Sequence, residues 1–225
     1  GFTNVASGYA ALPNPDLKPE TSRGVDAGLR GDHGALQWTL TAHASRYRDF
    51  IDSRRNVGVD PVTGLLLFQS VNRSRVETWG AEASARLALD GVGLDGGYLR
   101  FAASRTRGVD RTADLWLASI DPLRAVLGMG WRGDAGGVEL IATAAARQHD
   151  VSGTGAFIAP GYALLDVVAD WAFNDTFKVE AAVFNLADRR VWDGTDTAGV
   201  RATSAVLDRF TRPGRNARLT LTASF

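Results

Sequence analysis

Apolar and polar residues alternate over nearly the whole of this chain, and this period of two constrains its fold more than any other feature. In the last nine residues, Ala217, Leu219, Leu221, Ala223 and Phe225 alternate with Arg218, Thr220, Thr222 and Ser224. Successive side chains of a β-strand point to opposite faces of the sheet, so this pattern predicts strands with one apolar and one polar face. Helical periodicity is scarce, and the chain is therefore predicted to be all-β.

About nine segments carry the alternation. They are residues 25–29, 36–44, 79–89, 98–104, 123–131, 138–147, 164–173, 177–185 and 217–225. Short turns are expected at 31–35, 90–97, 132–137 and 173–176, and long loops near 50–66, 106–122, 148–160 and 187–213. Short turns at one end and long loops at the other indicate an antiparallel up-and-down sheet of the kind found in outer-membrane β-barrels.

Aromatic residues lie near both ends of the predicted strands, as expected of strands that cross a bilayer. The short-turn end has Trp38, Trp131, Trp171, Phe173, Phe177 and Phe225, and the long-loop end has Tyr47, Phe50, Trp79, Phe157, Tyr162, Phe184 and Trp192. The middle of the apolar face carries no charge, and an arginine there would cost about 2–4 kcal/mol. Arg46 and Arg105 lie on this face near the long loops, where their side chains can reach lipid headgroups.

Composition and spacing exclude several classes of protein. Lys and Arg balance Asp and Glu at 25 each, so a basic surface for nucleic acid is not expected. The chain has no Cys, and its three histidines, His33, His43 and His149, have no metal-ligand spacing. No Ser/His/Asp set can be assembled, so an enzyme is not expected. A soluble β-sandwich is the alternative fold, although its strands usually have about 5–6 residues.

Five stretches resemble, in order, the C-terminal part of TonB-dependent outer-membrane receptors. Residues 14–22 (NPDLKPETS) resemble a loop motif that precedes a barrel strand, with Asn14, Pro15, Asp16 and Leu17 at its start. Residues 47–52 resemble a strand-to-loop exit, and 71–87 carry a Gly-x-Glu signature. Residues 160–171 and 183–192 resemble the penultimate hairpin, with its Asn-Leu-x-Asp run at 185–188. The last strand resembles an insertion signal for the barrel-assembly machinery, carried by Leu219, Leu221 and Phe225.

This resemblance implies an antiparallel transmembrane β-barrel of about 22 strands in the bacterial outer membrane. Residues 1–225 would supply about the last nine strands, with the plug, the first strands and the TonB-contacting segment upstream. The implied function is active transport energised by the TonB system, and the implied partners are outer-membrane lipid, TonB and the assembly machinery. Polar residues expected to line the lumen are Asp26, His43, Glu82, Arg86, Asp166, Asp170, Lys178, Glu180 and Arg218.

Residues 106–131 resemble the haem, haemoglobin and transferrin/lactoferrin branch of that family through Leu117, Ile120 and Pro122. Haem or a haem protein is therefore the expected cargo, with no covalently bound cofactor and no resident metal. A receptor for a siderophore or another metal chelate is the nearest alternative, and a passive porin or autotransporter barrel is a more distant one. The loop residues that could face a ligand are Arg54, Arg55, Trp116 and His149, although each is also explained as an ordinary loop residue.

Overall fold

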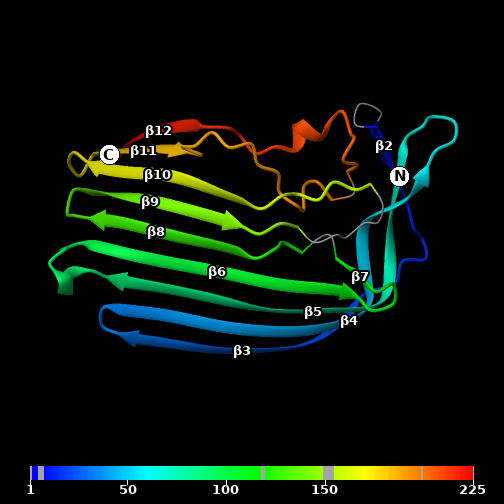
Figure 1. Ribbon diagram of the computed structural model, residues 1–225, viewed down its shortest axis with the longest axis horizontal. Coiled ribbons are helices and arrows are strands. Elements are labelled where there is room, and N and C mark those ends of the chain that lie inside the picture. The colour runs from blue at the N-terminus through cyan, green and yellow to red at the C-terminus, as the bar shows by residue number, and fades with distance from the viewer. Residues whose placement is uncertain (1, 5–7, 118–119, 149–154, 199, 225) are drawn as a thin grey trace. The chain divides into compact units, whose positions relative to one another are not determined.

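A computed structural model describes residues 2–4, 8–117, 120–148, 155–198 and 200–224, which form a 12-stranded β-sheet (Figure 1). The nine long strands are β3 (Thr21–His33), β4 (Leu36–Val59), β5 (Leu66–Ala88), β6 (Gly97–Asp110), β8 (Arg124–Arg132), β9 (Gly136–Ala145), β10 (Tyr162–Ala172), β11 (Phe177–Phe184) and β12 (Asn216–Ala223). The short strands are β1 (Phe2–Asn4), β2 (Tyr9–Leu12) and β7 (Leu115–Trp116). Within these residues, no helix has the length and hydropathy that a membrane-spanning helix needs.

Consecutive long strands are neighbours throughout the sheet, from β3 beside β4 to β11 beside β12. The registers of β6 with β8, and of β8 through β12 in turn, are antiparallel. The connections near residues 34, 90–96, 133–135 and 173–176 are short, at the positions that the sequence predicts. The prediction of an all-β, antiparallel up-and-down sheet with about nine main strands is therefore confirmed.

The register aligns the apolar rows of neighbouring strands into one continuous face. Val167 of β10 lies opposite Val183 of β11 on one side and Leu140 of β9 on the other. Large apolar side chains on this face are exposed, among them Val25 at 71% and Leu219 at 74%. Few soluble sheets leave so much apolar surface open to water. The exposed apolar face therefore indicates contact with lipid and not the interior of a β-sandwich.

Two of the predicted loops are partly wrong. Residues 50–59 belong to β4, β5 begins at Leu66, and β6 continues to Asp110. The turn between β4 and β5 is closed by Asp60, whose carboxylate accepts hydrogen bonds from the N–H groups of Val62 and Thr63. Because a strand that continues past a bilayer contacts water on both faces, it loses the alternation by which it could be recognised.

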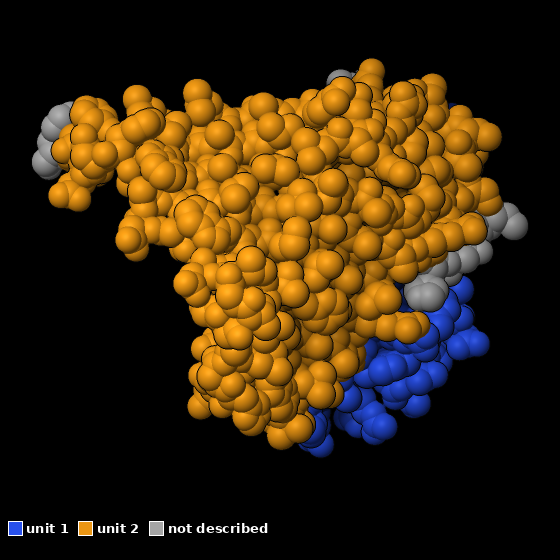
Figure 2. Space-filling view, turned by 60° about the vertical axis from the view of Figure 1, so that its left-hand side comes forward, with its two compact units in different colours: residues 1–25, 43–79, 107–117 blue, residues 26–42, 80–106, 118–225 orange. Residues whose placement is uncertain are grey.

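The chain divides into two compact units, distinguished by colour in Figure 2. Unit 1 consists of residues 1–25, 43–79 and 107–117, and unit 2 of residues 26–42, 80–106 and 118–225. In unit 1, β1 and β2 form an antiparallel hairpin, and β2 pairs in parallel with Leu66–Gln69 of β5. These short strands carry too few residues for alternation to reveal them, and they are not among the nine segments expected from the sequence.

The prediction of interfacial aromatic residues is confirmed at the short-turn end of the strands and is partly wrong at the long-loop end. At the short-turn end, Trp131, Trp171, Phe173 and Phe177 are exposed, as an interfacial belt requires. At the long-loop end, Tyr162 instead shares the polar face with Arg124 and donates a hydrogen bond to Asp193. Trp192 packs against Phe157 and donates to the carbonyl of Leu207. The expectation that Tyr162 and Trp192 are interfacial aromatics at the long-loop end is therefore wrong, because the hydroxyl of Tyr162 bonds Arg124 and Asp193 and the indole N–H of Trp192 bonds a loop carbonyl.

Candidate functional site

Ion pairs connect several strands of unit 2 across its polar face. Asp170 of β10 accepts a 2.8 Å hydrogen bond from Arg132 of β8 and lies 3.7 Å from the Nζ of Lys178. Lys178 in turn contacts Glu180 at 3.0 Å, and a separate pair joins Arg100 of β6 to Glu139 of β9. Both signs of charge alternate along this wall, so it can contact a polar surface without presenting one dominant charge.

Two glycines of β8 make room for these side chains. A Cβ at Gly128 would lie 2.2 Å from the Oε1 of Glu139 and 2.7 Å from the Nε of Arg100. A Cβ at Gly130 would lie 2.4 Å from the ring of Tyr98. The side chains of β6 therefore lie flat across β8, and the Arg100–Glu139 pair bridges two strands that are not neighbours.

The polar-face residues expected from the sequence have varied roles. Asp170, Lys178 and Glu180 join the ion pairs, and the guanidinium of Arg86 lies 3.9 Å from the centre of the Tyr98 ring. Asp166 accepts a hydrogen bond from the N–H of Asn185. By alternation, Asp26, His43, Glu82 and Arg218 lie on the same face of their strands. Arg100, Arg132 and Glu139 are not among the polar residues expected from the sequence, although the Gly-x-Gly spacing at 128–130 is a signal for large neighbouring side chains.

A second polar cluster lies at the long-loop end of unit 2. The carboxylate of Asp193 accepts hydrogen bonds from Tyr162 at 2.9 Å and from Arg212, and it lies 3.6 Å from Arg124. Asp193 and Arg212 belong to the loop between β11 and β12, whereas Arg124 and Tyr162 begin β8 and β10. The cluster therefore fastens this long loop to two strands.

The Asn-Leu-x-Asp run fixes the start of the same loop. Asn185 has a φ of 52°, and its side chain donates to the carbonyls of Arg189 and Pro213 and accepts from the N–H of Arg189. Asp188 accepts from the N–H of Arg215. Since asparagine tolerates positive φ better than most residues, the motif acts as a structural clasp that holds the two ends of the loop together.

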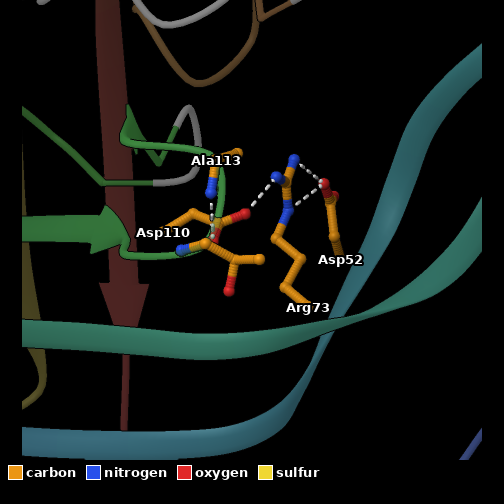
Figure 3. A network of polar contacts seen from close by, with 5 residues as sticks. Asp52, Arg73, Asp110 and Ala113 are labelled. Carbon is orange, nitrogen blue, oxygen red and sulfur yellow. Dashed lines mark hydrogen bonds and ion pairs between the residues drawn. The ribbon is translucent and has the colours of Figure 1, made fainter.

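Unit 1 contains the most buried ion-pair network of the described residues (Figure 3). Arg73 of β5 donates to Asp52 of β4 through its Nε and Nη2, at 2.9 and 2.6 Å. Its Nη1 donates to Asp110 at 2.6 Å, and Asp110 is 2% exposed. The other oxygen of Asp110 accepts from the N–H groups of Thr112 and Ala113. Three separate segments of the chain are joined through this one arginine.

The network shifts the pKa of its buried carboxyl. Burial by itself would raise the pKa of Asp110, but the hydrogen bonds from Arg73, Thr112 and Ala113 together hold that pKa below its usual range. The N–H groups of Thr63 and Val62 likewise lower the pKa of Asp60 in the β4–β5 turn. Both carboxyl groups lie outside the apolar band, and both remain ionised at neutral pH.

The motif at residues 14–17 lies along β5. Asn14 donates to the carbonyl of Ser70 at 2.9 Å and accepts from the N–H of Asp16. Further along, Asn72 accepts from the N–H of Lys18 and donates to its carbonyl, and also donates to the carbonyl of Asp49. These contacts give the segment a structural role beside β4 and β5, and Pro15 and Leu17 lie between its anchored residues.

Of the four loop residues suggested for ligand contact, Arg55 and Trp116 have described side chains. Arg55 of β4 is exposed, the side chain of Arg54 is outside the described structure, and His149 is outside the described residues. Trp116 of β7 pairs with Val109, and the guanidinium of Arg107 lies 5.6 Å from the centre of its ring. Leu219 and Leu221 are exposed on the apolar face, and Phe225 is outside the described residues. The described part of the chain has no group of three or more His, Asp or Glu side chains suited to a metal.

Comparison with known proteins identifies the family to which this sheet, with one apolar and one polar face, belongs. Residues 1–186 match the family model described as TonB dependent receptor-like, beta-barrel. The chain belongs to this family. Its sheet is thus part of an outer-membrane receptor barrel, its apolar face is the lipid face and its polar face is the lumenal wall. The family consists of receptors and transporters and not of enzymes.

The curated relatives of this receptor chain include several iron-acquisition proteins. A probable hemoglobin and hemoglobin-haptoglobin-binding protein 4 of Haemophilus influenzae is 24% identical over the whole chain, which covers 26% of that relative. An iron-regulated outer membrane virulence protein of Vibrio cholerae is 30% identical over 83% of the chain, which covers 30% of that relative. The chain thus spans between a quarter and a third of the length of these proteins.

Solved structures of this family share the fold. The copper transporter OprC superposes with a TM-score of 0.78 and 20% identity, over 93% of this chain and 32% of that one. The ferric enterobactin receptor of Pseudomonas aeruginosa superposes with a TM-score of 0.70 and 21% identity, over the same shares. At this level of identity the likeness concerns the fold alone.

Proposed function

We propose that this chain is the C-terminal wall of an outer-membrane importer that takes up haem, or haem iron from a haem protein, with energy from the TonB system. In this proposal residues 1–225 contribute nine strands to a larger barrel, and a plug encoded upstream occupies the lumen. The observation that carries the assignment is that the curated relatives matched over the full chain are named for binding haemoglobin. A hemin receptor of Yersinia pestis matches over 49% of the chain, at 27% identity.

The polar face of unit 2 has the ion pairs expected of a barrel wall that contacts a movable plug. The alternating charges from Arg100 to Glu180 can exchange partners with a plug, because each is at the surface of the sheet and not sealed within a core. The ion pairs between wall residues also reduce the unpaired charge that the lumen exposes when no plug residue contacts them. The same arrangement suits any cargo, so it supports transport and leaves the choice of cargo to the loops.

A ferric siderophore is the second candidate cargo. The Vibrio cholerae relative, the most identical of those named above, is described only as iron-regulated, and solved relatives include ferric enterobactin receptors. Haem is preferred because haemoglobin-binding relatives align with the whole chain and not with part of it.

Growth of a strain that lacks other iron receptors tests the choice of cargo. The intact receptor gene should restore growth on haem or haemoglobin as the sole iron source, and the restoration should require TonB. Growth on a ferric siderophore with no growth on any haem source would assign the siderophore and refute haem. Uptake that continues without TonB would refute active transport and favour a passive barrel.

A further inference from the structure

Two long loops of unit 2 are hydrogen-bonded to each other through their backbones. The N–H of Phe157, in the loop between β9 and β10, donates to the carbonyl of Val200 at 2.8 Å. The N–H of Ala202, in the loop between β11 and β12, donates to the carbonyl of Gly155 at 3.0 Å, and an isolated β-bridge lies between these two bonds. The described residues of these loops, 146–148 and 155–161 before β10 and 185–198 and 200–215 before β12, are called the paired loops below.

Apolar side chains pack the paired loops together beside this bridge. The ring of Phe157 lies 5.6 Å from that of Trp192, centre to centre, in an edge-to-face arrangement. Val191, the neighbour of Trp192, is 2% exposed, and Ala159 is 3% exposed. Buried side chains are few in this sheet, so the paired loops have a small core of their own.

Gln148 lies where the paired loops meet the segment that leads into β8. Its backbone N–H donates to the carbonyl of Ala159 at 3.0 Å, and its Nε2 donates to the carbonyl of Ile120 at 3.3 Å. A Cβ at Gly194, in the other loop, would lie only 2.7 Å from the Cδ of Gln148. Because Gln148 is buried, its side chain cannot turn towards water unless the two loops separate.

A buried threonine connects the β-bridge to the Asp193 cluster. The Oγ1 of Thr197 donates to the carbonyl of Asp193 at 2.9 Å, and its own carbonyl accepts from the N–H of Val200 at 3.0 Å. Thr197 is 1% exposed. The residue that pairs with Phe157 is therefore held, through Thr197, by the same Asp193 that bonds Tyr162 and Arg212.

Hydrogen bonds and buried contacts that two loops share are lost to both when either loop opens. Opening of one loop alone would leave backbone and side-chain groups of the other without partners, which is unfavourable where water is excluded. We propose that the paired loops open and close as one cooperative body and not as two independent loops. A molecule that binds the closed form of one loop would then also protect the other, because coupling between two sites is reciprocal. The proposal is independent of the cargo that the receptor carries.

Amide hydrogen exchange of the intact receptor in mild detergent tests this proposal. Gly194→Ala, in the loop before β12, places a methyl group where the side chain of Gln148 packs. We expect this variant to raise exchange at Phe157, in the other loop, by about tenfold and by the same factor as at Ala202 in its own loop. The added methyl group has no route to Phe157 along the chain, so a change there reports on the coupling of the loops.

The reciprocal substitution starts from the loop before β10. Phe157→Ala removes the ring that packs on Trp192. Exchange should then rise at Thr197 and Arg212, whose N–H groups bond the carbonyls of Asp193 and Val191 inside the other loop. A rise confined to the substituted loop in either variant would overturn the proposal, and so would factors that differ by more than about threefold between the loops.

Two controls separate coupling from general damage to the barrel. Gly91→Ala is the matched substitution, because an added Cβ there has no atom of the described residues within 4 Å, and it should exchange as the wild type does. Heat-modifiable gel mobility and unchanged exchange of β11 check that each variant is assembled. If Gly194→Ala fails to assemble, Val191→Ala, which removes buried methyl groups from the same loop, takes its place with the same expected result.

Discussion

Arg73 shows how much of unit 1 depends on a single side chain. It joins β4, β5 and the end of β6 through Asp52 and Asp110, and Asp110 alone accepts three hydrogen bonds. A buried carboxylate that loses its partner, or an arginine that loses its carboxylate, costs about 1–3 kcal/mol. The loop that follows β6 is therefore held by charge at one point, and the sequence does not show this, because Arg73 and Asp110 are distant along the chain.

The first prediction concerns Asp110. Replacing Asp110 with Asn should increase amide hydrogen exchange of residues 107–117 at pH 7 by about tenfold, because the amide cannot pair with Arg73 as a charge. Asp114→Asn is the control: Asp114 is exposed in the same loop at a φ of 51°, which asparagine tolerates. If both variants exchange alike, the ion pair does not hold the loop.

Acid should reproduce the effect of the Asp110→Asn variant. The pKa of Asp110 is lowered in the folded protein, so its stabilising contribution is present above the unfolded pKa of about 3.9 and is lost as pH falls through the lower, folded value. Exchange of residues 107–117, corrected for the intrinsic rate, should therefore rise in the wild type below about pH 4. The Asp110→Asn variant should show a smaller acid dependence, and an equal one would contradict the assignment.

At the scale of the element, substitutions at two adjacent residues of β10 test which face of the sheet contacts lipid. Val167 lies on the apolar face and Val168 on the polar face, opposite Glu139. Val167→Arg should block assembly of the intact receptor, because a charge in hydrocarbon costs about 2–4 kcal/mol. Val168→Arg, the same substitution one residue later, should assemble. Heat-modifiable mobility of outer-membrane extracts measures both, and equal tolerance would refute the assignment of the faces.

The strands inside the bilayer are more predictable from sequence than those outside it. In β10 and β12, lipid on one side and polar groups on the other impose strict alternation, and their bounds agree with the expected ones within about two residues. Residues 50–59 of β4 contact water on both sides, so the sequence shows no period there. Tyr162 was misplaced for a related reason: an aromatic ring fits a belt or a hydrogen-bonded cluster, and composition alone does not separate the two.

The candidate site was harder to predict than the fold. Asp170, Lys178 and Glu180 were found because they stand on strands with clear alternation, whereas Arg100 and Glu139 meet only because Gly128 leaves space between them. Asp193 and Arg212 meet because Asn185 and Asp188 fold the loop back. Contacts between residues that are distant along the chain, and that meet only after the strands and loops are in place, leave no local pattern in the sequence.

At the scale of the whole molecule, the two outermost long strands each have one neighbour in the described structure. β3 pairs only with β4, and β12 pairs only with β11. With nine long strands in alternating direction, β3 and β12 run the same way, whereas the strands of such a barrel are antiparallel and usually even in number. Unpaired backbone groups in hydrocarbon cost several kcal/mol each.

We therefore expect residues 1–225 alone to aggregate or to remain associated with detergent as an open sheet. Co-expression with the upstream part of the gene should convert them into a heat-modifiable species. The measurement is gel mobility with and without heating, together with hydrogen exchange of β3. A monomer of residues 1–225 with a protected β3 would contradict this expectation.

The extended pairing of β4 with β5 has a consequence for proteolysis of this hairpin. The hairpin carries exposed arginines, among them Arg48 and Arg55, which are the residues after which trypsin cuts. A protease must hold its substrate as a single extended segment, and here that segment is already hydrogen-bonded to its neighbour up to the Asp60 turn. A trypsin-like protease would therefore meet several suitable side chains on this hairpin but little chain that it can cut.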